Sequence, residues 1–295
     1  MAGIPKTYFK ITSLRERYYK ASLGKESLIK IINEVEVSEH VYNSNAIENS
    51  TLTLEETEKI LMQIELSRYV SERELFEAKN LALVMNYIDQ RAKTNEPTKE
   101  LLLLLHKMLL GNIREEIAGR FRNPTEWVRV GNYIAANPIE VSGLLDSMFI
   151  TLHSTPQANI IKRIAELHLT FEHIHPFCDG NGRIGRVLNN FILVKEGYVP
   201  INIAFSNRAD YYEAFRKFDV DGTTSKMEVI VGRALAESYH KRLAYLEGKK
   251  IITLNEYAKS KKISLSNLIN KAHRQTIEAF REKGVWKISQ SYVLV

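Results

Sequence analysis

Cysteine, proline and glycine are scarce in this chain, and each scarcity excludes a class of protein. The single cysteine, Cys178, cannot form a disulfide within the chain. Seven prolines and fourteen glycines among 295 residues argue against disorder. No run of about eighteen apolar residues exists, and the N-terminal stretch lacks the apolar core of a secretory signal. We therefore expect a soluble, cytoplasmic protein with no membrane partner.

Apolar residues make up 44% of the chain and charged residues 26%, as in ordinary soluble proteins. The length suits one large domain with a small appendage, or two modest domains. The formal net charge of +6 is unevenly placed, because residues 251–295 hold eight Lys or Arg against three Glu. That segment carries +5, and the rest of the chain carries +1. Any electrostatic affinity for nucleic acid should therefore be sought in the tail.

Apolar residues recur with the period of a helix over most of the chain, which predicts a mostly helical, all-α fold. Leu101–Leu105 is apolar on nearly every side, so we place it at the centre of the core. Residues suited to helix ends are Thr53 with Glu56, Ser71 with Glu74, Thr98 and Gly111. Further helices are expected over 158–174, 182–196, 208–218 and 226–246.

Two segments interrupt this helical pattern. Trp127–Ile134 alternates and contains Gly131, which predicts a short hairpin or extended flap. After a linker at 248–250, helices over 253–260 and 265–283 and a terminal hairpin over 284–295 suggest a helix-turn-helix or winged-helix module. The basic residues that would contact DNA phosphates are Lys261, Lys262, Lys271 and Arg274. A protein-docking role for the same module stays open.

The segment from His175 to Arg186, HPFCDGNGRIGR, holds the residues most suited to chemistry. Pro176 disfavours helical geometry at the preceding residue, so the helix before it should stop and leave His175 at the mouth of a loop. An imidazole suits base chemistry near neutral pH. Gly180 and Gly182 permit positive φ and close approach of the backbone. A helix that begins after such a loop offers unpaired N–H groups to an anion.

Charged groups in the same segment extend this anion site. Arg183 and Arg186 are three residues apart, so one helical face can direct both guanidinium groups toward the same anion. Asp179 supplies a hard oxygen ligand of the kind that Mg²⁺ on a polyphosphate needs. Asn181 adds side-chain donors. A base, a metal ligand, a phosphate cradle and charge clamps therefore lie within twelve residues.

These residues resemble the signature of the Fic family, His-x-Phe-x-(Asp/Glu)-Gly-Asn-Gly-Arg-x-x-Arg. Its eight fixed positions are filled by His175, Phe177, Asp179, Gly180, Asn181, Gly182, Arg183 and Arg186. A chance match has a frequency of about one in 10^10 per starting point, so the signal is strong. The intact Gly-Asn-Gly-Arg distinguishes the chain from the related Doc kinases.

The resemblance implies a Fic-type helical bundle that transfers AMP from ATP to a Ser, Thr or Tyr hydroxyl of a target protein and of itself. It implies that His175 is the general base, that Asp179 is the Mg²⁺ ligand and that Arg186 binds the γ-phosphate. The implied phosphate-binding residues also include Gly180, Asn181, Gly182, Arg183, Ile184 and Gly185. The implied partners are ATP and a target protein that the sequence does not name. A homodimer is an open alternative, because the sequence does not give the oligomeric state.

Other parts of the chain extend the resemblance over residues 40–245. The stretch AGRFR, residues 118–122, looks like the family's Gly-x-(Phe/Tyr)-Arg segment. The family's flap, which pairs with the target chain, would comprise Val130, Gly131, Asn132 and Tyr133. Tyr211 and Tyr212 sit where the family contacts the base and ribose, and core packing is an equal alternative for both. Asp219 falls near an adenine-binding position that is often Asn.

The segment Ser44–Asn49 resembles the family's inhibitory motif, (Ser/Thr)-x-x-x-Glu-(Gly/Asn), with Ser44, Glu48 and Asn49 at its fixed places. Its position before the core implies the class with an N-terminal inhibitory helix, here near 38–49. The Glu48 carboxylate would pair with Arg186 and remove the partner of the γ-phosphate. The same carboxylate could instead orient a water that removes AMP.

Several alternatives compete with this interpretation. Another Fic chemistry, such as UMP transfer or AMP removal, is one, and a DNA-binding regulator whose Fic core senses nucleotide is another. The Gly180-x-Gly182-x-x-Gly185 spacing also fits a dinucleotide-binding loop, but a helix rather than a strand precedes it. A zinc site near His168 lacks supporting ligands, and Cys178 lacks the neighbours of a nucleophile.

The domains expected are a helical region over 1–95, a Fic core over 96–247 and a winged-helix-like domain over 251–295.

Overall fold

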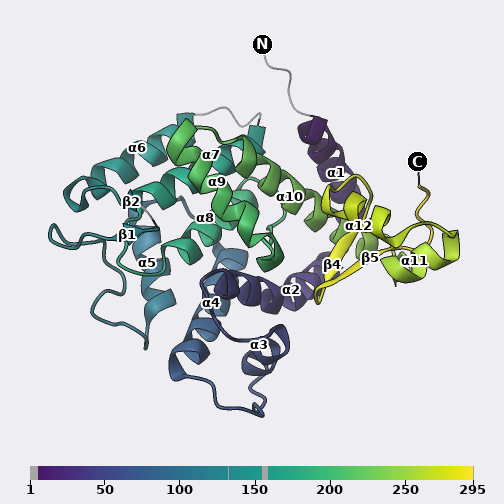
Figure 1. The fold of residues 1–295 in the computed structure, drawn as a ribbon, viewed down its shortest axis with the longest axis horizontal. Helices are drawn as coiled ribbons and strands as arrows, with labels where there is room; N and C mark the ends of the chain where they lie inside the picture. The colour runs from purple at the N-terminus through teal and green to yellow at the C-terminus, as the bar shows by residue number, and fades with distance from the viewer. Residues whose placement is uncertain (1–5, 132, 155–158, 295) are drawn as a thin grey trace. The chain divides into compact units, whose positions relative to one another are not determined.

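A computed structural model describes residues 6–131, 133–154 and 159–294, and it is mostly helical with two small antiparallel sheets (Figure 1). This confirms the predicted fold class. The chain divides into two compact units, one formed by residues 37–228 and the other by residues 1–36 together with 229–295. In the described residues, no helix is both long and apolar enough to cross a membrane.

The unit of residues 37–228 contains the predicted core helices. It begins within α2, Glu26–Ile47, and ends within α10, Ser225–Leu246. Between them lie α3 (Leu54–Leu61), α4 (Glu72–Arg91), α5 (Lys99–Leu110), α6 (Val141–Ser154), α7 (Ile160–Ile174), α8 (Asn181–Lys195) and α9 (Arg208–Asp221). Helix α8 contacts α4, α5 and α7, so it is the central helix of this unit.

Capping residues set the starts of three helices where the sequence predicts them. Thr53 and Glu56 form a complete capping box at α3, Ser71 accepts a hydrogen bond from the Glu74 N–H at α4, and Thr98 caps α5. Each cap satisfies an N–H that the helix itself leaves unpaired. The predicted boundaries of α4 and α5 are therefore correct to within about two residues.

The core of this unit contains the apolar stripe of α5, as expected. Leu102, Leu105 and Leu109 are fully buried, whereas Leu104 is 42% exposed, so the stripe is buried on most sides but not on all. The predicted helix from 158 begins at Ile160, and residues 155–158 lie outside the described part. Helix α8 follows it closely, and both flank the loop that bears His175.

The predicted flap is a small hairpin. Its strands are β1 (Arg129–Val130) and β2 (Tyr133–Ile134), which pair antiparallel. Gly131 has a φ of +56°, the left-handed conformation that a tight turn needs and that glycine adopts without strain. Asn132, the other turn position, lies outside the described residues.

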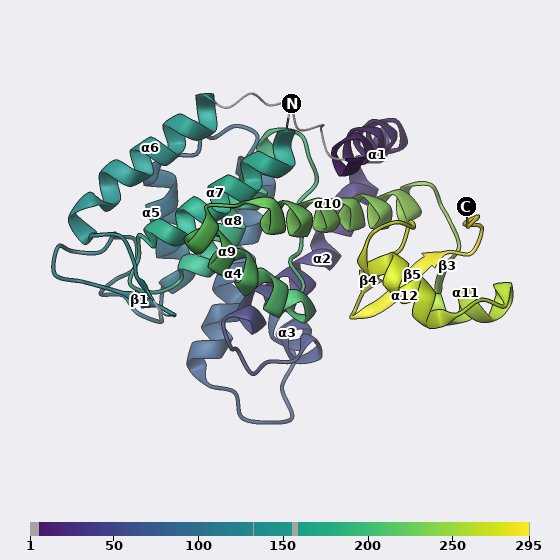
Figure 2. The ribbon, with the colours of Figure 1, turned by 45° about the horizontal axis from the view of Figure 1, so that its top comes forward.

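The second unit includes α1 (Lys6–Ser22) and the C-terminal segment. There, β3 (Ile251–Thr253) leads into α11 (Leu254–Lys261) and α12 (Leu265–His273), and then come β4 (Phe280–Glu282) and β5 (Val285–Ser289). The sheet has the order β3-β5-β4, and both pairs are antiparallel. Figure 2 shows α11 and α12 beside this sheet.

Two expectations for the tail are wrong. The helix predicted over 265–283 stops at His273, because Gln275 takes a positive φ of 54° and the chain turns into β4. The terminal hairpin pairs β5 with β4 rather than within 284–295, since Lys283 and Gly284 both have the positive φ of a tight two-residue turn. The three-part domain division stays a prediction.

Candidate active site

His175 lies where helix α7 ends, in a left-handed conformation with φ 51° and ψ 61°. Its N–H still donates to the carbonyl of Phe171 at 2.9 Å, and Pro176 prevents any further helical turn. The Nδ1 atom of His175 lies 3.3 Å from the carbonyl oxygen of Glu172. Because that carbonyl can only accept, Nδ1 carries the proton and Nε2 is the free basic nitrogen.

Burial keeps the His175 imidazole neutral. It lowers the pKa to about 4, helped by the nearby positive charge of Arg122, while the hydrogen bond to the Glu172 carbonyl opposes this effect. A neutral imidazole at physiological pH is the form that can accept a proton. The sequence prediction that this side chain lies at the mouth of a loop agrees with its 16% exposure.

The loop after His175 is held by one buried asparagine and one aromatic stack. The Asn181 side chain accepts from the Phe177 N–H at 2.9 Å and donates to the Phe177 carbonyl at 2.8 Å. The Phe177 ring, fully buried, stacks on His106 with centroids 3.8 Å apart. The Asn181 amide is therefore used within the loop, and only its backbone N–H is left to face an anion.

The start of α8 has the backbone geometry that an anion site requires. The first hydrogen bond of the helix runs from the Ile184 N–H to the Gly180 carbonyl, so the N–H groups of Asn181, Gly182 and Arg183 have no partner within the helix. No side chain caps this end. Gly180 takes φ +80° and Gly182 leaves no room for a Cβ, which would collide with the Glu48 carboxylate. The positive end of the helix dipole therefore lies beside the Glu48 carboxylate, an anion of this chain.

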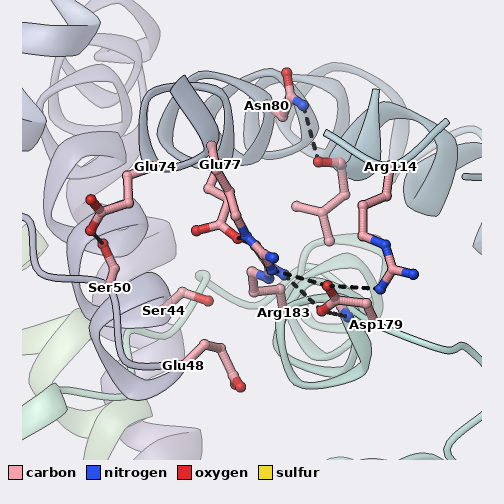
Figure 3. A network of polar contacts seen from close by, with 12 residues as sticks. Ser44, Glu48, Ser50, Glu74, Glu77, Asn80, Arg114, Asp179 and Arg183 are labelled. Carbon is pink, nitrogen blue, oxygen red and sulfur yellow. Dashed lines mark hydrogen bonds and ion pairs between the residues drawn. The ribbon is translucent and has the colours of Figure 1, made fainter. Parts of the chain in front are cut away.

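Asp179 lies beside this helix end, near Arg183 and Arg114 (Figure 3). One carboxylate oxygen accepts from the Gly180 N–H at 2.6 Å and from Arg183 at 3.2 Å. The other lies 3.1 Å from Arg73 and 3.9 Å from Arg114. Arg183 also pairs with Glu77 at 3.1 Å. The two acidic and three basic side chains form a linked network that surrounds the anion site.

Arg186 points from α8 into a pocket of polar groups from α2 and α9. Its Nη2 lies 2.9 Å from Glu48 Oε1 and 2.8 Å from the Ser44 carbonyl, and its Nε donates to the Ser44 hydroxyl at 3.0 Å. Its Nη1 donates to the Tyr211 hydroxyl at 3.2 Å. These partners and the anionic Glu48 raise the pKa of Arg186 despite burial, so the guanidinium stays charged.

Arg122 is a site residue whose contacts the sequence did not predict. Its guanidinium donates to the carbonyl of His175 at 2.8 Å, to that of Ala136 at 2.7 Å and to that of Glu126 at 3.0 Å. It is only 4% exposed. Since Ala136 and Glu126 flank the hairpin, one side chain fixes both the base of the flap and the loop that bears the imidazole. The AGRFR motif is the signal that marked its position.

Glu172 is a second unpredicted residue, one turn of α7 before His175. Its Oε1 is buried without a hydrogen-bond partner, and its Oε2 lies 3.9 Å from His175 Nδ1. Burial raises the pKa of Glu172 to about 8, with a further contribution from the charge of Glu48. This carboxyl is therefore mostly protonated at neutral pH. Only its side-chain burial, and no sequence motif, distinguishes it.

His106 is a third unpredicted residue. It accepts the Gly119 N–H on Nδ1 at 3.0 Å, so Nε2 carries the proton that it donates to the Asp179 carbonyl at 3.1 Å. Burial lowers its pKa to about 4. His106 therefore stacks on the Phe177 ring and also holds the backbone of Asp179, the candidate metal ligand. Its place inside the apolar run of α5 made it resemble an ordinary core position.

The remaining predicted residues lie in different places. Tyr211 is 2% exposed and its hydroxyl also contacts His168 at 2.6 Å, whereas Tyr212 is 44% exposed and contacts the Ile47 carbonyl at 3.3 Å. Asp219 lies 3.3 Å from His173, whose ring stacks on Tyr133 of the flap. Asp219 is therefore near the flap.

The structure also describes four further predicted positions. Ile184 and Gly185 are both buried in α8, and Val130 lies in β1. The Asn49 side chain accepts a hydrogen bond from Arg208 at 2.7 Å.

The competing interpretations find little support in the described residues. No group of three or more metal-binding side chains occurs among them, and His168 is a fully buried core residue bonded to Tyr211. Burial raises the pKa of the Cys178 thiol, which disfavours the reactive thiolate. The helix α7 before the glycine-rich loop is not the strand that a dinucleotide site needs.

Sequence comparison finds relatives for most of the chain. Residues 96–193 match the profile of the Fic/DOC family. A protein adenylyltransferase Fic from Nematostella vectensis is 30% identical over 211 residues, which are 69% of this chain and 48% of the relative. One from Drosophila virilis is 32% identical over 177 residues, 59% of this chain and 36% of the relative. The chain thus spans about half the length or less of the curated relatives it matches.

Solved structures agree with these relatives. A Fic domain-containing signaling protein from Bacteroides thetaiotaomicron is 25% identical with a TM-score of 0.71, over 81% of this chain and 97% of that one. Fic-1 from C. elegans is 25% identical with a TM-score of 0.70, over 82% of this chain and 71% of that one. A Fic family protein from Desulfovibrio desulfuricans, 19% identical, shares the fold over 99% of this chain and 98% of its own, with a TM-score of 0.68. The profile, the relatives and the shared fold place this chain in the Fic/DOC family.

Proposed function

We propose that this protein transfers AMP from ATP to a hydroxyl group of a target protein and of itself. One observation carries the proposal: a neutral imidazole, His175, and the unpaired N–H groups of α8 belong to one rigid loop. A base and a set of unpaired N–H groups close together in the chain are the combination that nucleotide transfer to a hydroxyl needs. The names of the relatives, protein adenylyltransferase, support the same reaction.

The residues divide the reaction between them. His175 Nε2 takes the proton of the Ser, Thr or Tyr hydroxyl while the hydroxyl oxygen bonds to the α-phosphorus. The bond from the α-phosphorus to the bridging oxygen breaks, and pyrophosphate leaves with the electron pair. The backbone N–H groups of Asn181, Gly182 and Arg183 hold the phosphate oxygens, and the Arg183 and Arg186 side chains bind the leaving group. The flap around Val130 and Tyr133 holds the target chain in an extended conformation.

Magnesium is the cofactor that the site fits. Asp179 presents one carboxylate next to the proposed phosphate site, and Mg²⁺ in proteins is commonly held by one or two carboxylates together with phosphate oxygens. When bound, the ion would neutralise charge on the α- and β-phosphates. The guanidinium groups of Arg73 and Arg114 lie near Asp179 in this structure. With the metal bound to Asp179, they would pair with other anions, such as the phosphates.

We further propose that Glu48 inhibits this reaction. Its carboxylate lies 2.9 Å from Arg186, the residue assigned to the γ-phosphate, and fills the space above Gly182. A triphosphate must therefore displace an anion or bind with its phosphates out of line for attack. The Ser44 hydroxyl and carbonyl hold Arg186 in this state. Asn49, next to Glu48, completes the proposed inhibitory motif.

The test is label transfer by the full chain. The Glu48→Gly protein is incubated with Mg²⁺ and each α-labelled nucleoside triphosphate in turn, and a Glu48→Gly, His175→Ala protein serves as the matched control. Label from ATP, lost in the control and greatly reduced in wild type, is the expected result. Label from UTP instead would favour UMP transfer, and equal label in wild type and Glu48→Gly would refute inhibition. Chelation of Mg²⁺ should abolish transfer.

Loss of AMP from a modified substrate, measured with the same variants, tests the alternative that Glu48 directs water to remove AMP. The roles of Tyr211, Tyr212 and Asp219 in holding the nucleoside are part of the proposal, as are the three domains. The homodimer and the cytoplasmic location stay predictions.

A further inference from the structure

The C-terminal segment holds two short helices and a three-stranded sheet that the proposed reaction does not use. Helices α11 and α12 are joined by a three-residue turn, residues 262–264, in which Lys262 adopts a left-handed conformation. We propose that the exposed face of α12 binds duplex DNA in the major groove. This function is independent of AMP transfer.

The helix pair and sheet form a small core of their own. Leu254 and Tyr257 of α11, Leu268 and Ala272 of α12, and Ile288 of β5 are all buried together. The order of elements, strand, helix, turn, helix and a two-stranded hairpin, is that of winged helix-turn-helix modules. In such modules the second helix enters the major groove and its N-terminal part reads base edges. Here that helix is α12.

Helix α12 separates its two faces sharply. Leu268 and Ala272 point into the core. The opposite side carries Ser266, Asn267, Asn270 and Arg274, all exposed, with Lys271 half-buried beside them. Their spacing of four residues places them on one face. Every one of these side chains can donate a hydrogen bond, as contacts to phosphates and base edges require.

The charge of this region also favours a polyanion. Residues 251–274 contain Lys259, Lys261, Lys262, Lys271 and Arg274 and a single acid, Glu256. The Glu256 carboxylate is held in a capping box by the N–H and hydroxyl of Thr253. The net charge of this short segment is therefore +4.

The acids that follow in sequence are engaged by cations of the same unit. Glu278 lies 2.6 Å from Arg17 and 3.4 Å from Lys249, and Glu282 pairs with Lys287. Neither carboxylate is left to offset the charge of α12. The turn of the β4–β5 hairpin adds the exposed Lys283, which is placed as the wing of such modules is, next to the DNA backbone.

A protein-docking face would look different. Protein interfaces centre on exposed aromatic and large apolar side chains. In the described residues from 254 to 294, the exposed large apolar side chains are Val285, Val293 and Leu294, and none of them lies on α12. The surface of α12 therefore offers charge and hydrogen bonds without an apolar anchor, which matches DNA better than a protein partner.

The experiment measures binding of the full-length protein to a fluorescent 30-base-pair duplex of mixed sequence at low and at moderate salt. The test variant is Lys271→Glu with Arg274→Glu. The matched control, Lys79→Glu with Lys93→Glu, changes the net charge equally at exposed residues of the other unit. Thermal melting and label transfer on each variant show that the fold and the catalytic core are intact.

We expect wild type and the control to bind within about threefold of each other, and the test variant to bind at least about tenfold more weakly. For about four phosphate contacts, affinity should fall on the order of 100-fold between 50 and 200 mM salt. Equal weakening by both variants would show nonspecific attraction and overturn the assignment to α12. No binding by wild type at low salt, or capture of a protein with no DNA affinity, would overturn the proposal itself.

Discussion

Nη2 of Arg186 lies 2.9 Å from Oε1 of Glu48, although 138 positions separate the two residues in the chain. The contact joins the turn after α2, which precedes the Fic domain, to the last arginine of the family signature. A charge-assisted hydrogen bond at this distance is among the stronger polar contacts in proteins. Under the proposed inhibition, Glu48 and the γ-phosphate compete for this guanidinium.

This competition predicts a difference between two nucleotides. Replacing Glu48 with Gln keeps the shape of the side chain and removes its charge, so the affinity for ATP should rise about tenfold, a gain of about 1.4 kcal/mol. The affinity for ADP, which lacks the γ-phosphate, should change little. Calorimetric titration of both nucleotides into wild type and Glu48→Gln measures the difference. Equal gains for ATP and ADP would place the effect elsewhere than on the γ-phosphate.

The pKa of His175 predicts an unusual dependence of rate on pH. Burial lowers this pKa to about 4, so the base stays neutral when pH falls through 6.5, the ordinary value for histidine. With Glu48→Gly protein, label transfer should stay nearly constant from pH 8 down to about 5.5 and decline only in more acidic buffers. Circular dichroism at each pH shows that the protein is folded. A rate that halves near pH 6.5 would contradict the buried, neutral imidazole.

Glu172 predicts that removing a buried carboxyl stabilises the protein. Its pKa is about 8 in the folded state and near 4.5 when unfolded, so only the unfolded state loses this proton between those values. Folding stability therefore falls as pH rises from 4.5 to 8. At pH 7 the cost is about 3 kcal/mol. Glu172→Gln should remove this cost, and its melting temperature should exceed that of wild type at pH 7.5 but match it near pH 4.5.

Melting curves at both pH values check this prediction, and label transfer by the same variant shows what the carboxyl does for catalysis. Since Oε2 of Glu172 lies 3.9 Å from Nδ1 of His175, we expect a lower maximal rate with an unchanged Michaelis constant for ATP. A Glu172→Gln protein less stable than wild type at pH 7.5 would mean that the carboxyl is charged and paired in the folded state.

Arg122 predicts that lysine cannot replace arginine at the base of the flap. Its guanidinium donates to the carbonyls of His175, Ala136 and Glu126 at once, and an ammonium group cannot span that fork. Arg122→Lys should leave buried carbonyls unpaired and cost about 2–4 kcal/mol of stability. Urea unfolding measures this loss. Arg120→Lys, a neighbour paired with the partly exposed Glu126, is the matched control and should cost under about 1 kcal/mol.

Label transfer separates structure from catalysis in the same pair of variants. Because Arg122 holds the backbone of His175, transfer by folded Arg122→Lys should fall at least about tenfold when the Glu48→Gly background removes inhibition. Full activity would show that the loop keeps its geometry without this contact.

Local features of the sequence were enough to predict the helices and the loop of the site. The caps at Thr53 and Thr98 depend on neighbours three residues away, and the signature from His175 to Arg186 is contiguous. The secondary structure of the C-terminal segment was harder to predict, because the sequence between His273 and Phe280 fits a helix about as well as a turn. Only the pairing of β5 with β3, 34 to 38 positions away, shows that this segment must leave the helical path.

The sequence alone determined that a base, a carboxylate, glycine amides and two arginines occupy one short segment, because a turn followed by a helix start is encoded by its own residues. Tertiary structure decided which distant side chains complete that segment. His106 and Glu172 are ordinary residues in the linear chain, whereas Arg122 and Glu48 lie in recognisable motifs whose contacts the sequence does not give in full. They become parts of the site because packing brings their elements to α8 and excludes water, which changes the pKa values of the two histidine rings and of the Glu172 carboxyl.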